Sequence, residues 1–286
     1  MRRLVPLFLL SAFGSATMNA KLPDYSRALE LYERTEYRDS LRALLPIAQK
    51  DAAALALTGQ NYFMLGDDRK ATESMEKALS IEPDNAIFAH WLGRIYARRA
   101  ELGNALTALG YALKAGQMFE KSVALNPANK EAEGDLLDFY LEAPGFAGGG
   151  IDKAEKIAAQ IARIDPAEGH YAQAQIEQKR KNFSSAEQHL RLARELAPTQ
   201  VGRAMDLAMF LARRGRIGES EDLFETAARL APDRPKILFE RANTYIEQRR
   251  NLAQAKQLLE RYIQARLTPN DPPRDKALAL LKKIAA

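Results

Sequence analysis

The sequence contains no cysteine and only three histidines. The absence of cysteine excludes disulfide bridges, cysteine-ligated zinc, iron–sulfur clusters and thiol catalysis. The histidines are far apart in sequence, and the chain has neither a Gly-x-Ser-x-Gly turn nor a His-Glu-x-x-His helix. We therefore predict no catalytic residues, no metal site and no cofactor, and we expect a protein that is not an enzyme.

The sequence also has little excess of one charge sign over the other. The 286 residues carry 42 Lys+Arg against 37 Asp+Glu, a formal net charge of +5. This excess is too small and too dispersed for the basic footprint of a nucleic-acid-binding protein. An apolar fraction of 47% and a charged fraction of 28% are ordinary for a folded chain.

The first twenty residues have the pattern of an export signal. Two arginines precede the apolar run Leu4–Phe13, and small residues follow it. The run is about ten residues long, too short for a membrane-spanning helix, and no later segment is long and apolar enough to span. We predict a signal peptide over 1–20, cleaved after Ala16 or Ala20, and an exported periplasmic or secreted protein. No cysteine follows, so a lipoprotein is excluded; the alternative is an uncleaved anchor or a miscalled start.

One sequence pattern recurs along the chain. The segment Met75–Pro83 is echoed at Phe119–Pro127, Leu190–Pro198 and Phe224–Pro232, and a degenerate copy ends at Pro166. The closing prolines are separated by 44, 39, 32 and 34 residues. A recurring period of this size indicates a stack of supersecondary units, each of which completes its core against its neighbours.

Within a unit the apolar spacing is helical. In the second unit Leu55, Gly59 and Tyr62 recur at intervals of four and three, and Ala71 and Met75 lie on a second stripe after a Gly-Asp-Asp break. The closing proline ends the second helix. Gly59 and Ala71 are small because two helices of a hairpin approach closely only where side chains are nearly absent.

These features resemble the tetratricopeptide repeat family, whose unit is a hairpin of two helices with small residues at the crossing points, aromatics beside them and a closing proline. The resemblance implies an all-α, right-handed superhelical solenoid of about seven hairpins with a C-terminal capping helix. The expected units and cap are 21–51, 52–85, 86–129, 130–166, 167–200, 201–234, 235–268 and the cap at 269–286.

The third unit is about ten residues longer than the repeat. The extra material lies between Ala97 and Gln117 and carries a stripe of leucines, so we predict a lengthened hairpin and not a loop. The insertion is interpreted either as local packing against the neighbouring unit or as a projecting platform for a partner. The stripe consists of Leu102, Leu106, Leu109 and Leu113.

The fourth unit contains a glycine-rich stretch, Ala143–Gly150. A phosphate-binding loop would need Lys and Ser/Thr next, whereas Ile151 and Asp152 follow. We therefore expect a tight, close-packed turn with Phe146 packed against a helix.

The resemblance implies a concave groove lined by the first helix of each hairpin. Met205, Met209 and Phe239 are interpreted either as its adaptable apolar floor or as core. The expected groove residues are Gln60, Phe63, Met64, His90, Arg94, Arg98, Asp135, Asp138, Tyr171, Gln175, Met205, Met209, Phe239, Asn243 and Glu247.

The charges in this set have a pattern of their own. His90, Arg94 and Arg98 recur every four residues as a basic ridge, beside an acidic ridge of Asp135 and Asp138. The ridges are interpreted either as partner-binding or as pairing between adjacent helices.

The expected function is that of a non-enzymatic protein–protein interaction scaffold of the cell envelope, which binds a peptide or extended protein segment in the groove. The alternative is a structural, self-assembling component of an envelope complex that uses its convex face or the long third hairpin. Homo-oligomers are possible in either case.

Overall fold

The computed structural model describes residues 23–48 and 51–285, so the expected signal peptide lies outside the described residues. Those residues form fifteen α-helices and one 3-10 turn, with no strand among them, which confirms the all-α prediction. No helix in this part of the chain combines the length and apolarity needed to cross a membrane. The elements are α1 (Pro23–Glu33), α2 (Tyr37–Leu44), α3 (Ala52–Met64), α4 (Asp68–Ile81), α5 (Ala86–Leu102), α6 (Ala105–Leu125), α7 (Lys130–Glu142), η1 (Gly145–Ala147), α8 (Ile151–Ile164), α9 (Pro166–Lys179), α10 (Phe183–Leu196), α11 (Val201–Arg213), α12 (Ile217–Leu230), α13 (Pro235–Glu247), α14 (Leu252–Gln264) and α15 (Arg274–Ala285).

Successive helices pack in pairs. The pairs run from α1 with α2 to α13 with α14, giving seven hairpins, and α15 packs on α14 and α13 as the last helix. The predicted solenoid of about seven hairpins with a C-terminal cap is therefore confirmed.

Local signals set the helix boundaries. The carboxylate of Asp51 accepts a hydrogen bond from the backbone of the third helical residue at 2.7 Å, and Asp67 and Asn85 cap α4 and α5 in the same way. Gly66 and Gly215, with φ of 78° and 76°, make the left-handed turns between the helices of their hairpins.

The crossing points of the hairpins are close-packed as the sequence predicts. A Cβ on Gly59 would lie 3.2 Å from the carbonyl oxygen of Ala71 and 3.3 Å from Met75. A Cβ on Gly93 would lie 2.6 Å from the ring of Phe119, so the third hairpin closes only around a glycine.

The core follows the array from end to end. Three clusters of buried apolar side chains succeed one another, from Ala28 to Ile176, from Ala174 to Ile237 and from Phe239 to Ala277. The first two clusters each draw on several hairpins, and the third joins the seventh hairpin to α15, so no cluster belongs to one hairpin alone.

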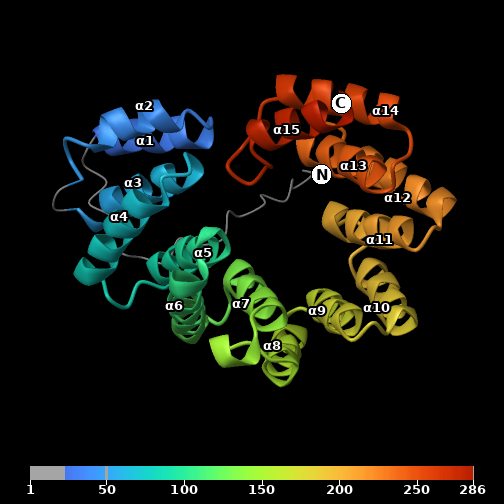
Figure 1. Ribbon diagram of the computed structural model, residues 1–286, viewed down its shortest axis with the longest axis horizontal. Coiled ribbons are helices and arrows are strands. Elements are labelled where there is room, and N and C mark those ends of the chain that lie inside the picture. The colour runs from blue at the N-terminus through green and yellow to red at the C-terminus, as the bar shows by residue number, and fades with distance from the viewer. Residues whose placement is uncertain (1–22, 49–50, 286) are drawn as a thin grey trace, which may run out of the picture.

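The array bends into an almost closed ring. The first hairpin, in blue, lies across a gap from α13, α14 and α15, in orange to red (Figure 1). The first helices of the hairpins form the inner wall and the second helices the outer wall (Figure 1). First helices also touch those of the next hairpin, as α1 touches α3 and α11 touches α13, because the inside of a bend is the crowded side.

The extra residues of the third unit lengthen its hairpin, as predicted. Helix α5 has 17 residues and α6 has 21. The leucines of the stripe do not pack against the next unit: Leu102 is 74% exposed and Leu106 is 93% exposed, and Leu109 and Leu113 are also exposed. The interpretation as local packing is wrong here, because the fourth hairpin contacts α6 in its C-terminal half, at Gly116, Phe119 and Glu120.

The glycine-rich stretch forms a tight turn around η1. A Cβ on Gly149 would lie 1.8 Å from the carbonyl oxygen of Ala143, which confirms the close-packed backbone. The expected packing of Phe146 is wrong: its side chain is 77% exposed, because Ala147 is the residue that this turn buries.

Candidate binding groove

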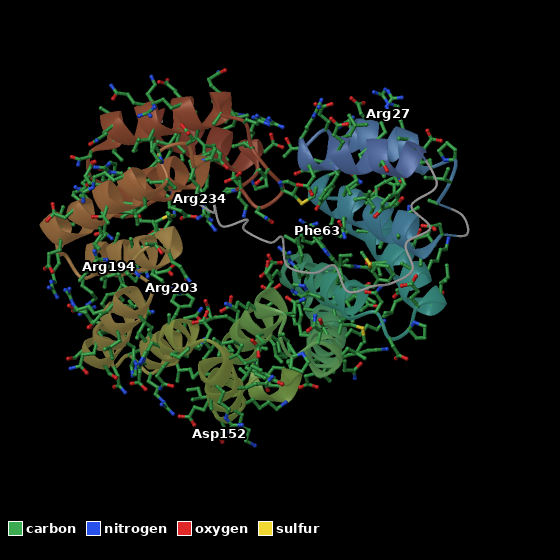
Figure 2. The ribbon with its side chains drawn as sticks, turned by 180° about the vertical axis from the view of Figure 1, so that it is seen from behind. Arg27, Phe63, Asp152, Arg194, Arg203 and Arg234 are labelled. Atoms are coloured by element: carbon green, nitrogen blue, oxygen red, sulfur yellow. The ribbon has the colours of Figure 1, made fainter. Side chains whose placement is uncertain are left out.

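The inner wall of the ring is the surface that the sequence analysis assigns to a partner. Phe63 and Arg203 lie on this wall on opposite sides of the central opening, whereas Arg27 and Asp152 lie on the outside (Figure 2).

Aromatic rings and arginines alternate on α3 and α5. Phe63 meets Trp91 edge to face, with ring centroids 5.7 Å apart. The guanidinium of Arg98 lies 3.3 Å from the centroid of Phe63, and that of Arg94 lies 4.7 Å from the centroid of Trp91. Both aromatic side chains are partly exposed. We call these four residues the aromatic wall.

Arg98 is already engaged within the molecule. Its guanidinium pairs with Asp68 at the start of α4, 2.6 Å away, and donates a hydrogen bond to the carbonyl oxygen of Phe63. Burial lowers the pKa of Arg98, and Asp68 opposes that effect. Arg98 therefore joins α5 to the second hairpin and is not free for a partner.

The basic and acidic ridges pair with each other. Nε2 of His90 lies 2.8 Å from Oδ2 of Asp135, and Nε of Arg94 lies 3.5 Å from the same oxygen. His90 is only 3% exposed. His90 is thus misassigned as a groove contact: it faces the neighbouring helix, and the pairing interpretation holds at Asp135. Arg94 stays partly exposed.

A small hollow opens between α7 and α9, with a volume of about 70 Å³. It brings together three expected residues, Asp138, Tyr171 and Gln175, and the unpredicted Lys130 and Glu168. The amide of Gln175 donates to the carboxylate of Asp138 at 2.8 Å. Desolvation by the surrounding wall raises the pKa of Asp138, opposed by that hydrogen bond.

Next to the hollow, Arg203 organises a charged cluster that the sequence analysis misses. Its guanidinium pairs with Glu168 at 2.6 Å and Asp206 at 3.0 Å, and stacks 4.1 Å from the ring centroid of Tyr171. Burial raises the pKa of Asp206 to about 6, although Arg203 opposes the shift. The Arg-x-x-Asp spacing on a first helix is the signal that would have found this cluster.

The remaining residues of the expected set lie on α3, α11 and α13. Gln60, Met64 and Met209 are partly exposed. The amide of Asn243 donates to Glu247 on its own helix at 2.8 Å.

Two of the expected apolar floor residues belong to the core. Met205 is 4% exposed and Phe239 is 7% exposed. Phe239 packs on Tyr262 of α14, with centroids 5.2 Å apart. Of the two interpretations, core is therefore correct for both residues, and the groove assignment is wrong.

The other two histidines meet in the fifth hairpin. Nδ1 of His170 on α9 lies 3.0 Å from Nδ1 of His189 on α10, within hydrogen-bonding distance. Among the described residues no group of three or more His, Cys, Asp or Glu side chains is placed to hold a metal ion.

Comparison with known proteins points to one family. Residues 52–85 match a family model described as tetratricopeptide repeat. A search of curated proteins finds no match to the chain.

Solved structures share the fold at low sequence identity. A tetratricopeptide repeat protein from Parabacteroides merdae is similar with a TM-score of 0.57 and 15% identity, over 92% of this chain and 98% of that one. TTC0263, a thermophilic TPR protein in Thermus thermophilus, is similar with a TM-score of 0.52 and 21% identity, over 66% and 97%. A chain of the APC/C hetero-tetramer Cut9–Hcn1 is similar with a TM-score of 0.51 and 12% identity, over 91% of this chain but only 48% of its own length.

The matched unit has the helical stripe, the small crossing residues and the closing proline described above, and the six hairpins around it repeat its architecture. Residues 52–85 are thus a tetratricopeptide repeat, and the described part of the chain shares the fold of solved tetratricopeptide repeat proteins.

Proposed function

We propose that this protein is a non-enzymatic scaffold that binds a protein partner and holds a peptide or extended segment along the inner wall of the ring. The observation that carries the proposal is the aromatic wall. Phe63 and Trp91 present partly exposed aromatic area on a concave surface, next to the half-exposed Arg94. Partly buried aromatic and arginine side chains are the types that dominate binding energy at interfaces.

The side chains that line the groove indicate which residues a partner segment should carry. The aromatic wall suits an apolar anchor residue, and the hollow at Asp138 suits a hydrogen-bond donor a few residues further along. A single anchor is typically worth about 1–3 kcal/mol, so we expect a complex of about micromolar affinity.

The test reverses two solvent-accessible groove charges, each of which makes one contact with a neighbouring helix: Arg94 with Asp135 and Asp138 with Gln175. Arg94→Glu changes a side chain whose ion pair is long, and Asp138→Lys changes an exposed carboxylate. Arg98 is left intact because it joins two hairpins. The matched control is Arg163→Glu, an exposed charge on the outer helix α8.

Partners are captured from the native envelope fraction with wild type, double variant and control, and are quantified by mass spectrometry. A peptide from the captured partner is then titrated calorimetrically. We expect the double variant to lose the partner at unchanged melting temperature, and the control to retain it. Equal capture by all three proteins would remove the groove from the proposal.

The envelope location rests on the sequence of residues 1–20 alone. We propose export with cleavage after Ala16 or Ala20. The intact mass of the protein purified from its native host gives the mature N-terminus directly, and a mass that includes Met1 or residues 2–16 contradicts the export step.

A second candidate function is self-assembly through the long third hairpin. Its tip exposes four leucines, with no charged residue between Glu101 and Lys114. An uncharged apolar stripe is complementary to a second copy of itself, and an exposed stripe of this kind is typical of an interaction surface. Sedimentation of the chain with and without residues 100–112, and of Leu106→Glu, tests it: a dimer present in the wild type and lost in both variants supports assembly.

A further inference from the structure

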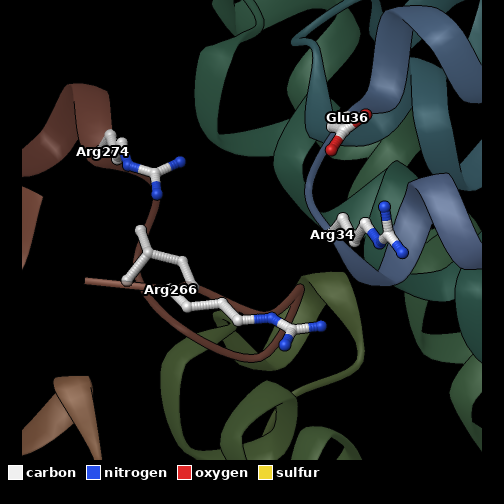
Figure 3. Close-up of a pocket in the computed structure, with 5 residues that line it drawn as sticks. Arg34, Glu36, Arg266 and Arg274 are labelled. Atoms are coloured by element: carbon white, nitrogen blue, oxygen red, sulfur yellow. The ribbon is translucent and has the colours of Figure 1, made fainter. Parts of the chain in front are cut away.

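The two ends of the array face one another across a cavity of about 320 Å³. Arg34 and Glu36, from the turn between α1 and α2, line one side (Figure 3). Arg266, Leu267 and Arg274, from the segment that follows α14, line the other (Figure 3). We call these five residues the end seam.

The charge of the end seam is unbalanced. Three guanidinium groups face a single carboxylate, that of Glu36. Arg34 also pairs with the exposed Glu30 near the end of α1, whereas Arg266 makes no hydrogen bond or ion pair to any residue that the structure describes. Like charges gathered in a hollow repel one another unless an anion lies between them.

One of the three arginines is held in position before any ligand arrives. Arg274 donates from Nε to the carbonyl oxygen of Ile263 at 3.1 Å and from a terminal nitrogen to that of Ala265 at 2.8 Å. These carbonyls end α14, and the buried Leu267 fixes the segment beside them. The guanidinium keeps further N–H donors for a ligand.

The two ends are close enough for their charges to interact. Burial raises the pKa of Tyr37 on α2 to about 12; Glu33 adds to the shift, Arg274 from the opposite end opposes it, and Asp271 raises it further. Glu33 and Asp271 are not among the five lining residues, so the cavity itself is lined mainly by guanidinium groups.

We propose that the end seam binds a small polyanion bearing carboxylate or phosphate groups, and that the bound anion bridges the two ends and holds the ring closed. Guanidinium groups bind both kinds of oxyanion through paired N–H donors. A cavity of about 320 Å³ accommodates an ion of the size of pyrophosphate or citrate.

Calorimetric titration with pyrophosphate and with citrate at low salt tests the site. We expect binding that weakens as salt rises, and a dissociation constant about fivefold or more higher in Arg266→Gln and in Arg34→Gln. Arg163→Gln, which removes an exposed charge on α8, is expected to bind as the wild type does. The groove variant Arg94→Glu is also expected to bind normally, which separates this site from the proposed peptide groove. No binding in the wild type, or an equal loss in Arg163→Gln, overturns the site.

A distance measurement tests the bridging. The chain has no cysteine, so spin labels can be placed at Ser26→Cys on α1 and Glu260→Cys on α14 without a competing thiol. Pyrophosphate is expected to shorten and narrow the distance distribution between the labels, and to have no effect on the same pair in an Arg266→Gln background. A distribution that pyrophosphate leaves unchanged overturns the bridging.

Discussion

At the scale of single residues, the inner wall is divided between side chains that already have partners and side chains that can still accept one. Asp135 accepts from His90 and faces Arg94, so its charge is largely satisfied within the ring. Phe63 and Trp91 have apolar faces that remain partly exposed. A partner therefore gains more from the aromatic rings than from the ridge charges.

Gly149 is expected to tolerate no side chain. Gly149→Ala places a Cβ against the carbonyl oxygen of Ala143, a backbone atom that can move only with the turn. We expect the free energy of unfolding to fall by about 3 kcal/mol. In the matched control Gly202→Ala the new Cβ meets nothing within 4 Å, so stability should stay the same or rise slightly. Urea denaturation of both variants measures the difference, and equal midpoints would contradict the close-packed turn.

Asp206 is expected to make stability depend on pH. Its pKa in the folded chain is about 6, above the ordinary value of 3.8, so the folded form takes up the proton first as pH falls. The free energy of unfolding should therefore decrease as pH rises from about 4 to about 6, by at most about 1.4 kcal/mol per pH unit.

The groups that face Asp206 are Arg203, Glu168, Lys236 and Glu240, and some of them titrate too. The measured quantity is therefore the difference between wild type and Asp206→Asn at several pH values. A difference that does not change between pH 4 and pH 6 would contradict the raised pKa.

At the scale of helices and hairpins, the sequence predicts most of what the structure contains. Apolar spacing of three and four, small crossing residues and closing prolines are local signals, and they predict the hairpins and the long third unit. Which residue of a first helix faces the groove is a finer question, because one residue turns a helix by about 100°. The assignments of Met205 and Phe239 to the groove are wrong for this reason.

Contacts between hairpins are beyond the reach of local patterns. Arg98 pairs with Asp68, thirty residues earlier, and Arg203 with Glu168, thirty-five residues earlier. Only the relative placement of two hairpins decides such pairs, so the pair of Arg203 with Glu168 escapes a sequence-based prediction, whereas its pair with Asp206 on the same helix is a local signal. The end seam depends on the summed curvature of all seven hairpins, so local sequence patterns do not predict it either.

The third hairpin provides a test of crossing geometry. Gly93→Ala brings a Cβ within 2.6 Å of the ring of Phe119, and we expect a loss of about 2 kcal/mol of stability. Phe119→Leu alone removes a buried ring and also destabilises. The double variant should be more stable than the sum of the two losses predicts, because the smaller side chain makes room for the new methyl group. Strict additivity in a double-mutant cycle would contradict the contact.

At the scale of the whole molecule, stability passes from one hairpin to the next. The first two core clusters each span several hairpins, and α15 completes the third, on the seventh hairpin, with the fully buried Ala277. An end hairpin without such a cover exposes apolar surface to water.

Removal of residues 269–286 is expected to loosen the chain from its C-terminal end. Without α15 the apolar faces of α13 and α14 become exposed, so amide exchange should accelerate first in these two helices and less in α11 and α12. The melting temperature should fall by a few degrees. Hydrogen exchange followed by mass spectrometry gives the order, and uniform acceleration along the whole chain would contradict stepwise coupling.

The proximity of the two ends also limits how this protein can change in length. A tandem duplication that inserted an eighth hairpin would drive the new helices into the first one, at the turn that carries Arg34 and Glu36. The array could accept such an insert only if its superhelical pitch increased, so that the two ends lay at different heights along the superhelix axis. Seven hairpins therefore occupy the full circumference that this curvature allows.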